Sequence, residues 1–419
     1  MSNAFSKEER VAFEEILGGF NDALVESRQV AKYGTDGTLM ERANDTIWRP
    51  MPYILTSQTR TIGTAVTPQI VTQLSVPSRL TGRPNVSWNM TALQLRDALQ
   101  EQRLGQAAYQ RLASDINTAV RNTAALQGTL VVPISGAAGS YDHVAAAENI
   151  MNEQGVPMED RTLVLNTRDY NGLAGNLANI NRSFGNAKSD NAYERSYVGP
   201  VAGFDTFKSD GTARITGGNP TVTIATNGAQ VRFVPRATDA NGNNVDNRTQ
   251  TVTVSSTSGV VAGMCFTVAG LESVHQITKQ PTGQLKTYRV ISVVDGTNMV
   301  ISPPMIGANS SPTNAELQYK NVEVVSTSAT AQITWLSRNT TGANPFWHRD
   351  SIELLLGRYA VPTDEGVAVI KGTTDQGLEV VMSKRFDNAT FTSLYTLDTF
   401  FGTVNTNPEM NGIILFGQP

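Results

Sequence analysis

Residues 91–128 form the longest stretch of this chain with one secondary-structure pattern, without proline and with one internal glycine. Apolar residues recur there every four positions, which predicts a stripe along one face of a helix: Leu104, Ala108, Leu112, Ile116 and Val120. Thr91 and Gln94 fit a capping box, and Gly128 fits a C-terminal stop. At about 1.5 Å per residue the helix would be roughly 55 Å long, far above the usual three turns. We therefore expect a structural spine, with Leu104, Leu112, Ile116 and Val120 as its core and its charged residues, from Arg96 to Arg121, exposed.

Composition excludes several classes of protein. Apolar residues make up 40% and charged residues 17% of the 419, so the chain should be folded, and no apolar run approaches the ~20 residues of a membrane helix. The net charge of −4 provides no basic field for holding nucleic acid. The single cysteine, Cys265, excludes internal disulfides and fits a reducing compartment. Cys265 lies in an alternating run, where a buried thiol is expected.

The N-terminal quarter changes from helical to extended patterning. Residues 6–33 predict one amphipathic helix, with its apolar face made by Val11, Ile16, Phe20, Leu24 and Val25. It would either pack on its own domain, which is the default, or lie as an arm on a neighbour. Residues 44–90 carry β-branched residues interrupted by five prolines, which favours edge strands or a hairpin that another surface covers.

Residues 129–220 alternate between strand and helix patterns, which is typical of an α/β domain. Strands are predicted at 129–135 and 161–166. Ser140 should cap a first helix that Gly155 ends, and Thr167 should start a second. A short helix and another strand follow before residue 205.

Residues 221–337 read as a separate all-β domain, a barrel or a sandwich, because no helical period interrupts about 115 residues. The clearest hairpin is VVDGTNMVIS, where Asp295-Gly296 predicts a two-residue type I′ turn. QVRFVP, at 230–235, is also expected to be a strand. A polar loop, residues 236–249, lies between two strands and is expected to be mobile or used in contacts. Mixed patterning resumes afterwards with a hairpin across Asp387-Asn388, so the β domain is an insertion.

No motif in the chain predicts catalysis, a metal centre or a cofactor. The three histidines, His143, His275 and His348, lack a second ligand at metal spacing. The polar loop resembles a calcium loop only in composition, because it lacks the glutamate at position twelve. A long helix, an extended hairpin, an arm and an inserted β domain are contact-making parts. They favour a self-assembling structural protein over an enzyme.

Several stretches, taken in order, are typical of one family. They are NDTIWRP (44–50), LRDALQEQRLGQAA (95–108), LVLNTRDY (163–170), VAGFD (201–205), DANGNNVDNR (239–248), VVDGTNMVIS (293–302) and NPFWHRDSI (344–352). They resemble the Hong Kong 97-type major capsid proteins and, more narrowly, the coat proteins of the short-tailed phage P22 and its relatives. Each match is short, but their order and their coverage make the set specific.

The resemblance implies an α+β capsid fold with these parts: an N-terminal arm (1–45), an E-loop on the neighbouring subunit (46–90), a P-domain spine helix (91–128), an A-domain (129–220), an inserted all-β barrel (221–337), and a return to A-domain and P-domain strands (338–419). The polar loop matches the family's D-loop, which contacts the next capsomer. That match makes Asp239, Asn241, Asp246 and Arg248 candidate assembly contacts, although they could be merely solvated loop residues.

The resemblance also implies a virion protein that assembles in the host bacterial cytoplasm. Hexamers and pentamers would form a closed shell with a scaffolding protein and a portal protein as partners. The shell would enclose double-stranded DNA without sequence-specific binding, and no membrane or cofactor is expected. Two alternatives are an encapsulin-like compartment shell and a β-rich phage tail or adhesin protein.

Overall fold

The structure is a computed structural model that describes residues 7–33, 46–52, 54–55, 62–63, 70–91, 98–180, 187–226, 228–307, 311–326, 328–359 and 368–419. The chain divides into two compact units, and each is made of segments that are distant in sequence. The first unit contains residues 1–47, 78–120 and 352–404. The second contains residues 48–77, 121–351 and 405–419.

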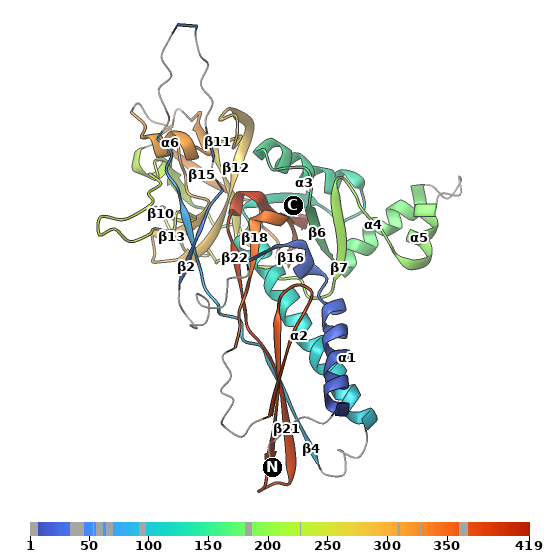
Figure 1. Cartoon of the computed structure of the whole chain (residues 1–419). Coiled ribbons are helices and arrows are strands. Elements are labelled where there is room, and N and C mark those ends of the chain that lie inside the picture. The colour runs from blue at the N-terminus through green and yellow to red at the C-terminus, as the bar shows by residue number, and fades with distance from the viewer. Residues whose placement is uncertain are drawn as a thin grey trace. The chain divides into compact units, whose positions relative to one another are not determined.

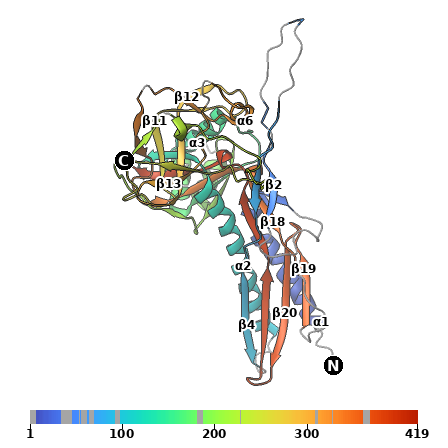
Figure 2. The same ribbon diagram turned by 90° about the vertical axis from the view of Figure 1, so that its left-hand side faces the viewer.

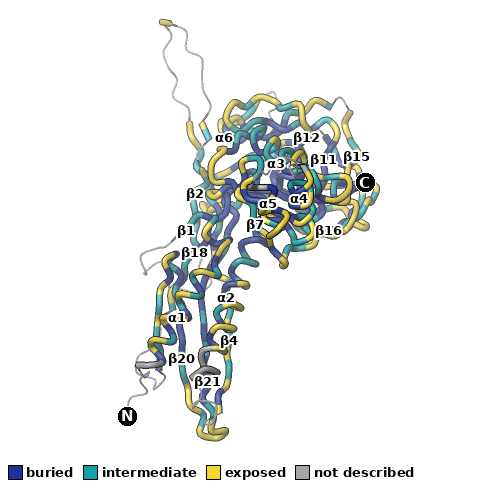
Figure 3. The backbone as a smooth tube through the Cα atoms, turned by 90° about the vertical axis from the view of Figure 1, so that its right-hand side faces the viewer, coloured by how far each residue is buried: buried dark blue, intermediate teal, exposed yellow. Residues whose placement is uncertain are grey.

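The first unit is built on a four-stranded antiparallel sheet, ordered β19 (Ala368–Thr373), β20 (Glu379–Asp387), β21 (Thr392–Thr399) and β4 (Asn85–Thr91) (Figure 2). Along β21 every second residue is buried, as expected for a sheet with one covered face. The expected hairpin across Asp387 is confirmed. The Asp387 carboxylate accepts the Ala389 N–H at 3.0 Å, and this bond and that from the Thr390 hydroxyl lower the pKa of Asp387. Figure 3 shows the exposed tip of this hairpin.

The N-terminal helix, α1 (Lys7–Ala23), is shorter than the sequence predicts. The chain continues as a 3₁₀ turn, η1 (Glu26–Gln29), and a strand, β1 (Ala31–Tyr33). Two side chains from elsewhere in the unit cap the end of the helix. Asn117 donates to the Ala23 carbonyl at 3.0 Å, and Gln376 donates to the Leu24 carbonyl at 3.1 Å. The Ala23 carbonyl also accepts the Val25 N–H at 3.1 Å, so both side chains and backbone satisfy the carbonyls at this helix end.

The apolar face of α1 is also narrower than expected. Val11 and Val25 are 51% and 41% exposed, whereas Phe13, Ile16 and Phe20 are buried. A Cβ added at Gly372 in β19 would meet the Phe13 ring at 2.7 Å, so α1 packs closely on the sheet. In the single chain, α1 therefore packs on its own unit.

The spine helix exists as α2 (Ala98–Gln127), but it does not begin at Thr91. Thr91 is the last residue of β4 and pairs with Thr392, so it cannot cap the helix. Gln94, Arg96 and Asp97 lie outside the described residues. Arg121 is buried rather than exposed. Gly128 follows the helix without positive φ. Glycine is required there for steric reasons, because an added Cβ would lie 2.7 Å from the Ala124 carbonyl oxygen.

A small sheet completes the first unit. It is ordered β1, β18 (Ile352–Leu356) and β22 (Phe401–Asn405), and β1 runs parallel to β18. Leu80, Leu355 and Phe400 form its buried cluster.

The second unit contains a five-stranded mixed sheet. Its order is β5 (Leu130–Ser135), β23 (Asn411–Gln418), β17 (Asn344–His348), β6 (Arg161–Asn166) and β7 (Phe204–Ser209). The helices are α3 (Tyr141–Gln154), α4 (Thr167–Ile180) and α5 (Ala187–Arg195). The expected caps of α3 are confirmed: Ser140 accepts the Asp142 N–H, and Gly155 adopts φ +79°.

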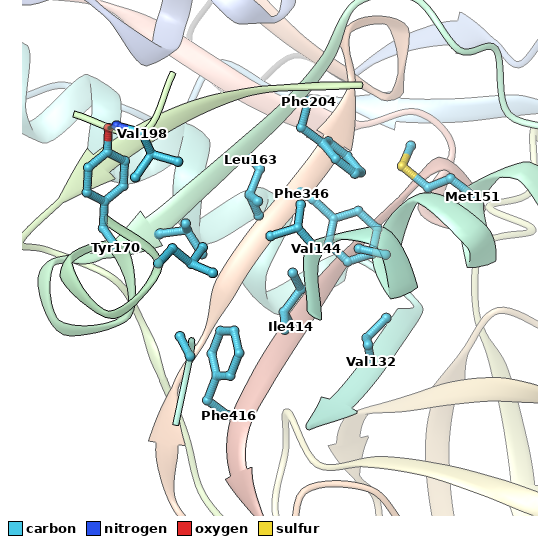
Figure 4. Packing of buried hydrophobic residues seen from close by; sticks show 14 of the residues in the cluster. Val132, Val144, Met151, Leu163, Tyr170, Val198, Phe204, Phe346, Ile414 and Phe416 are labelled. Atoms are coloured by element: carbon cyan, nitrogen blue, oxygen red, sulfur yellow. Dashed lines mark hydrogen bonds between the residues drawn. The ribbon is translucent and has the colours of Figure 1, made fainter. Parts of the chain in front are cut away.

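The core of this mixed sheet gathers side chains from helices and strands (Figure 4). Val144 and Met151 come from α3 and meet Leu163, Phe346 and Ile414 from three neighbouring strands, all at 0% exposure. Strands β17 and β23 belong to the sheet although they follow the β domain in sequence. The β domain is therefore inserted into the mixed domain, as the sequence predicts.

The inserted domain is a nearly closed sheet (Figure 1). The path runs β10 (Gln250–Thr253), β13 (Asn298–Ser302), β12 (Pro281–Val293), β11 (Cys265–Val274), β15 (Thr330–Trp335) and β9 (Thr223–Ala225), with β14 (Val322–Val324) paired to β11. An isolated bridge between Ile224 and Val254 brings the two ends of the path together. In its core Phe266 stacks on Tyr288 and meets Trp335 edge to face. Cys265 is buried, as expected.

Three details of this domain differ from the sequence expectation. A one-turn helix, α6 (Asn314–Tyr319), is stabilised by a capping box between Thr313 and Glu316. The QVRFVP segment forms a 3₁₀ turn, η3 (Gly228–Val231), and an irregular run with an isolated antiparallel bridge between Arg232 and Ile306. The Arg232 side chain pairs with Glu316 at 3.2 Å.

The β12–β13 hairpin forms, but neither Asp295 nor Gly296 has positive φ, so its turn is not type I′. Instead the Asp295 carboxylate accepts the N–H groups of Thr297 and Asn298 at 2.8 and 2.7 Å. These bonds, together with one from the Asn298 side chain, lower the pKa of Asp295 to about 2.

Within the extended segment, β2 (Ile47–Pro50) and β3 (Ser75–Ser78) pair as a two-stranded ribbon, and β4 follows in the sheet of the first unit. Its base packs on the inserted domain through Leu74, Ile306 and Tyr319. Of the segment 44–90, for which edge strands or a hairpin are expected, residues 56–61 and 64–69 lie outside the described residues. The remaining elements are β8 (Arg214–Ile215), β16 (Thr341–Gly342), η4 (Arg349–Ser351) and η5 (Pro408–Met410).

Candidate assembly surfaces

The tip of the polar loop is an ordered turn. Thr238 and Asn244 form an isolated bridge, and Gly242 between them adopts φ +83°. The Asp239 carboxylate accepts the N–H groups of Asn241 and Asn243 at 2.8 and 2.9 Å. Hydrogen bonds, chiefly those from Asn243, lower the pKa of Asp239, so this carboxylate stays charged. Residues 240–244 are exposed.

The base of the polar loop is clamped by charge pairing within the chain. Arg248 donates from Nε and Nη2 to the two Asp246 carboxylate oxygens, at 2.9 and 2.6 Å. Its third nitrogen, Nη1, donates to the Asn405 carbonyl at 2.7 Å. A bidentate pair of this kind fixes the direction of both side chains. Of the four predicted contact residues, Asp239 and Asn241 thus lie in the tip turn, and Asp246 and Arg248 pair with each other below it.

The predicted spine core divides into two groups. Leu112, Ile116 and Val120 are at 0% exposure, whereas Leu104 is 39% exposed and is not a core residue of the single chain. The buried face instead passes through Gly105, where an added Cβ would lie 2.6 Å from Cδ1 of Ile16. A four-residue repeat counted back from Ala108 predicts that Leu104 is buried. In the structure Gly105 is buried instead, because α1 approaches so closely there that a side chain would not fit.

Sequence reasoning missed two buried cations of the inserted domain. Lys286, 1% exposed, pairs with Glu409 of η5, 123 residues later. Arg289, fully buried, donates from Nη1 to the Ala125 carbonyl in the last turn of α2. A cation at a helix C-terminus also interacts favourably with the helix dipole. Both residues lie in β12, and the strand pattern of its sequence does not predict that their side chains bond to residues far away in the chain.

The described residues include no group of three or more His, Cys, Asp or Glu side chains arranged to hold a metal ion. His348 is buried, and burial lowers its pKa; its Nδ1 accepts the Asp350 N–H at 3.2 Å. Within the same part of the chain no helix is long and apolar enough to span a bilayer.

The spine helix and the inserted, nearly closed β sheet are features of the phage-capsid class of structural proteins. A family model described as P22 coat protein, gene protein 5, matches residues 1–417. The chain therefore belongs to the P22 coat protein family. It is a major capsid protein of a tailed phage, with the Hong Kong 97-type capsid fold and an inserted β domain, and it assembles with copies of itself into the shell of the virion.

Solved structures give further matches. The CUS-3 coat protein I-domain is 39% identical and covers 29% of this chain and 99% of that one, with a TM-score of 0.23. The capsid of Cyanophage P-SCSP1u is 10% identical and covers 92% of this chain and 85% of that one, with a TM-score of 0.43. A structure from Mycobacterium phage Che8 is 9% identical and covers 93% of this chain and 90% of that one, with a TM-score of 0.44.

Proposed function

We propose that this coat protein forms hexamers and pentamers around a scaffolding protein and a portal ring, in the host bacterial cytoplasm. The observation that carries the proposal is the family match over residues 1–417. The net charge of −4 supports a shell that encloses double-stranded DNA without gripping it. A coat-protein family also supports a role without catalysis, and it favours a phage head over a compartment shell or a tail adhesin.

The parts of the chain would then take the roles that the sequence suggests. Residues 1–45 would serve as the arm, 46–90 as the E-loop, 91–128 as the spine, 129–220 with 338–419 as the A-domain and P-domain, and 221–337 as the inserted domain. We assign the contact between neighbouring capsomers to the tip of the polar loop. Asp239 is a charged carboxylate held in place before contact, so it loses little side-chain entropy on binding. Asp246 and Arg248 would act by fixing the loop's direction.

The assembly function is tested by expressing the chain with a scaffolding protein and examining the particles by sedimentation and electron microscopy. We expect closed shells. A chain that remains monomeric under those conditions would contradict the proposal.

The loop assignment is tested by Asp239→Ala, with Asp295→Ala as the matched control. Both aspartates accept backbone N–H groups in exposed turns, so both variants lose a similar local interaction. An exposed ion pair contributes only about 0–1 kcal/mol, but a shell repeats it in every subunit. We expect both variants to fold, and only Asp239→Ala to reduce the yield of closed shells. Normal shells from Asp239→Ala and from a deletion of 236–249 would show that the loop is not an assembly contact.

A further inference from the structure

A cavity of about 50 Å³ lies within the second unit, between the base of the polar loop, the β11–β12 turn and η5. That space accommodates a few waters or one small anion. Its polar lining includes Arg248, Gln276, Lys279, Lys320 and Glu409, and the rest is mostly apolar.

The charges around this cavity do not balance. Arg248 pairs with Asp246, Lys320 pairs with Glu323, and the nearby Lys286 pairs with Glu409. Within the described part of the chain, no carboxylate oxygen lies within 4.0 Å of Lys279 Nζ, which donates to the Lys320 carbonyl at 3.2 Å. Four cations thus face three carboxylates, and Lys279 carries the excess charge.

The surroundings of Lys279 disfavour the protonated, charged form of its side chain. Burial, the first cause, and the neighbouring Lys286 and Lys320 lower the pKa of Lys279 to about 8, against the opposing effect of Glu409. The backbone of Lys279 is also unusual, because it adopts φ +57° in a region that glycine and asparagine favour. A lysine kept in such a position suggests that its side chain has a use.

A second donor at the same cavity lacks an acceptor. Nε2 of Gln276, three residues before Lys279, is buried and makes no hydrogen bond. A buried donor without a partner is costly, so an unseen acceptor is expected there. The same ligand can satisfy the amide and neutralise the lysine, if it carries negative charge and an accepting oxygen.

We propose that this cavity binds a small oxyanion, of phosphate or carboxylate chemistry, through Lys279 Nζ and Gln276 Nε2. The bound anion supplies the missing negative charge inside a cavity that is lined by the base of the polar loop, the β11–β12 turn and η5. The site is independent of the proposed assembly role, because a single folded subunit contains all of it.

The test titrates the full-length subunit with sodium phosphate, and separately with sodium acetate, at constant ionic strength and near pH 7. The thermal midpoint is recorded, and calorimetry measures binding directly. Anions that bind only the folded state raise the midpoint in a saturable manner, whereas general salt effects do not saturate. We expect a saturable rise with wild type and with Lys208→Gln, which removes an exposed lysine of β7 outside the cavity lining.

Two variants address the site itself. Lys279→Gln removes the unpaired charge and should abolish the saturable rise. Gln276→Glu builds the missing carboxylate into the chain, so it should have a raised midpoint without anion and no further saturable rise. If Lys279→Gln fails to fold, the proposal is still tested by comparing the saturable rise in thermal midpoint of Gln276→Glu with that of wild type.

Each outcome is informative. Saturation by phosphate identifies a free inorganic anion, and saturation by acetate alone identifies a carboxylate. A wild-type subunit that saturates with neither anion, or a Gln276→Glu variant that keeps the full response, would overturn the proposal.

Discussion

The register of α2 against α1 is set by individual residues. Leu112 is fully buried, and Leu104, eight residues earlier on the same helix, is 39% exposed. Gly105 lies where Ile16 of α1 comes closest. A single residue without a side chain therefore determines which leucine belongs to the core.

This difference predicts the effects of truncating the two leucines. Leu112→Ala should lower the free energy of unfolding by about 2–5 kcal/mol, because it leaves a cavity in the core. Leu104→Ala should change it by less than about 0.5 kcal/mol, as surface substitutions do. Urea denaturation of the unassembled subunit measures both. Aspartate sharpens the contrast: Leu112→Asp should prevent folding, and Leu104→Asp should not. Equal effects at the two positions would contradict the burial described above.

Asp295 predicts a pH-dependent contribution to stability. Its pKa is lowered to about 2 in the folded chain, below the ordinary value of 3.8. A lowered pKa stabilises the fold above the unfolded-state value, and the contribution is lost as pH falls through the folded-state value. The thermal midpoint of wild type should therefore exceed that of Asp295→Ala at pH 6, and the difference should shrink as pH falls from about 4 towards 2. A difference independent of pH would show that the carboxylate's charge plays no part.

At the scale of elements, helix α1 contains two adjacent glycines with opposite roles. Gly18 has nothing within 4 Å of an added Cβ, whereas at Gly19 that atom would lie 2.6 Å from the Tyr109 ring of α2. The sequence shows only that Gly18-Gly19 weakens the helix. Packing against α2 requires the second glycine and leaves the first unexplained.

Alanine at the two positions should separate propensity from packing. Gly18→Ala should raise the free energy of unfolding by about 0.5–1 kcal/mol, because alanine favours the helix. Gly19→Ala should lower it by about 1–3 kcal/mol, because Tyr109 or the whole of α1 must shift. Chemical denaturation of the full-length subunit compares them, and Gly18→Ala serves as the control for helix propensity. Stabilisation by both would mean that Tyr109 moves away at little cost.

At the scale of the whole molecule, a buried ion pair connects segments that are far apart in sequence. Lys286 of β12 bonds to Glu409 of η5 and also donates to Gln154 of α3 at 3.2 Å. The inserted domain is thereby bonded to the segment that precedes the final strand, β23. Removing one charge would leave the other buried and uncompensated.

Glu409→Gln should therefore cost about 3–5 kcal/mol of unfolding free energy. The double variant Lys286→Met with Glu409→Leu should be closer to wild type, because a buried pair can be replaced by apolar side chains at little cost. A double-mutant cycle in urea gives the coupling energy. Additive effects of the two single substitutions would show that the ion pair does not join these segments.

Much of this fold follows from local chemistry that the sequence carries in full. Ser140 and Gly155 bound α3 because a cap acts within a few residues, and the β20–β21 hairpin needs only its own strands and turn. The ordered family stretches led to the capsid fold and its insertion, since each stretch keeps its place along the chain. The polar loop was also predicted, because its composition departs from that of the strands around it.

Only the tertiary structure determined which partner each exposed or buried group meets. A helical repeat predicts a stripe but not its rotation, so it places Leu104 inside and gives no sign that Gly105 is buried. Arg121 was expected in solvent, and α1 was expected to continue to residue 33, because their burial and capping depend on distant segments. The pairing of Asp246 with Arg248, the Lys286–Glu409 bond and the uncompensated Lys279 arise from spatial proximity. Local preference acts over a few residues, whereas a charge takes whichever partner the folded chain brings within a few ångströms.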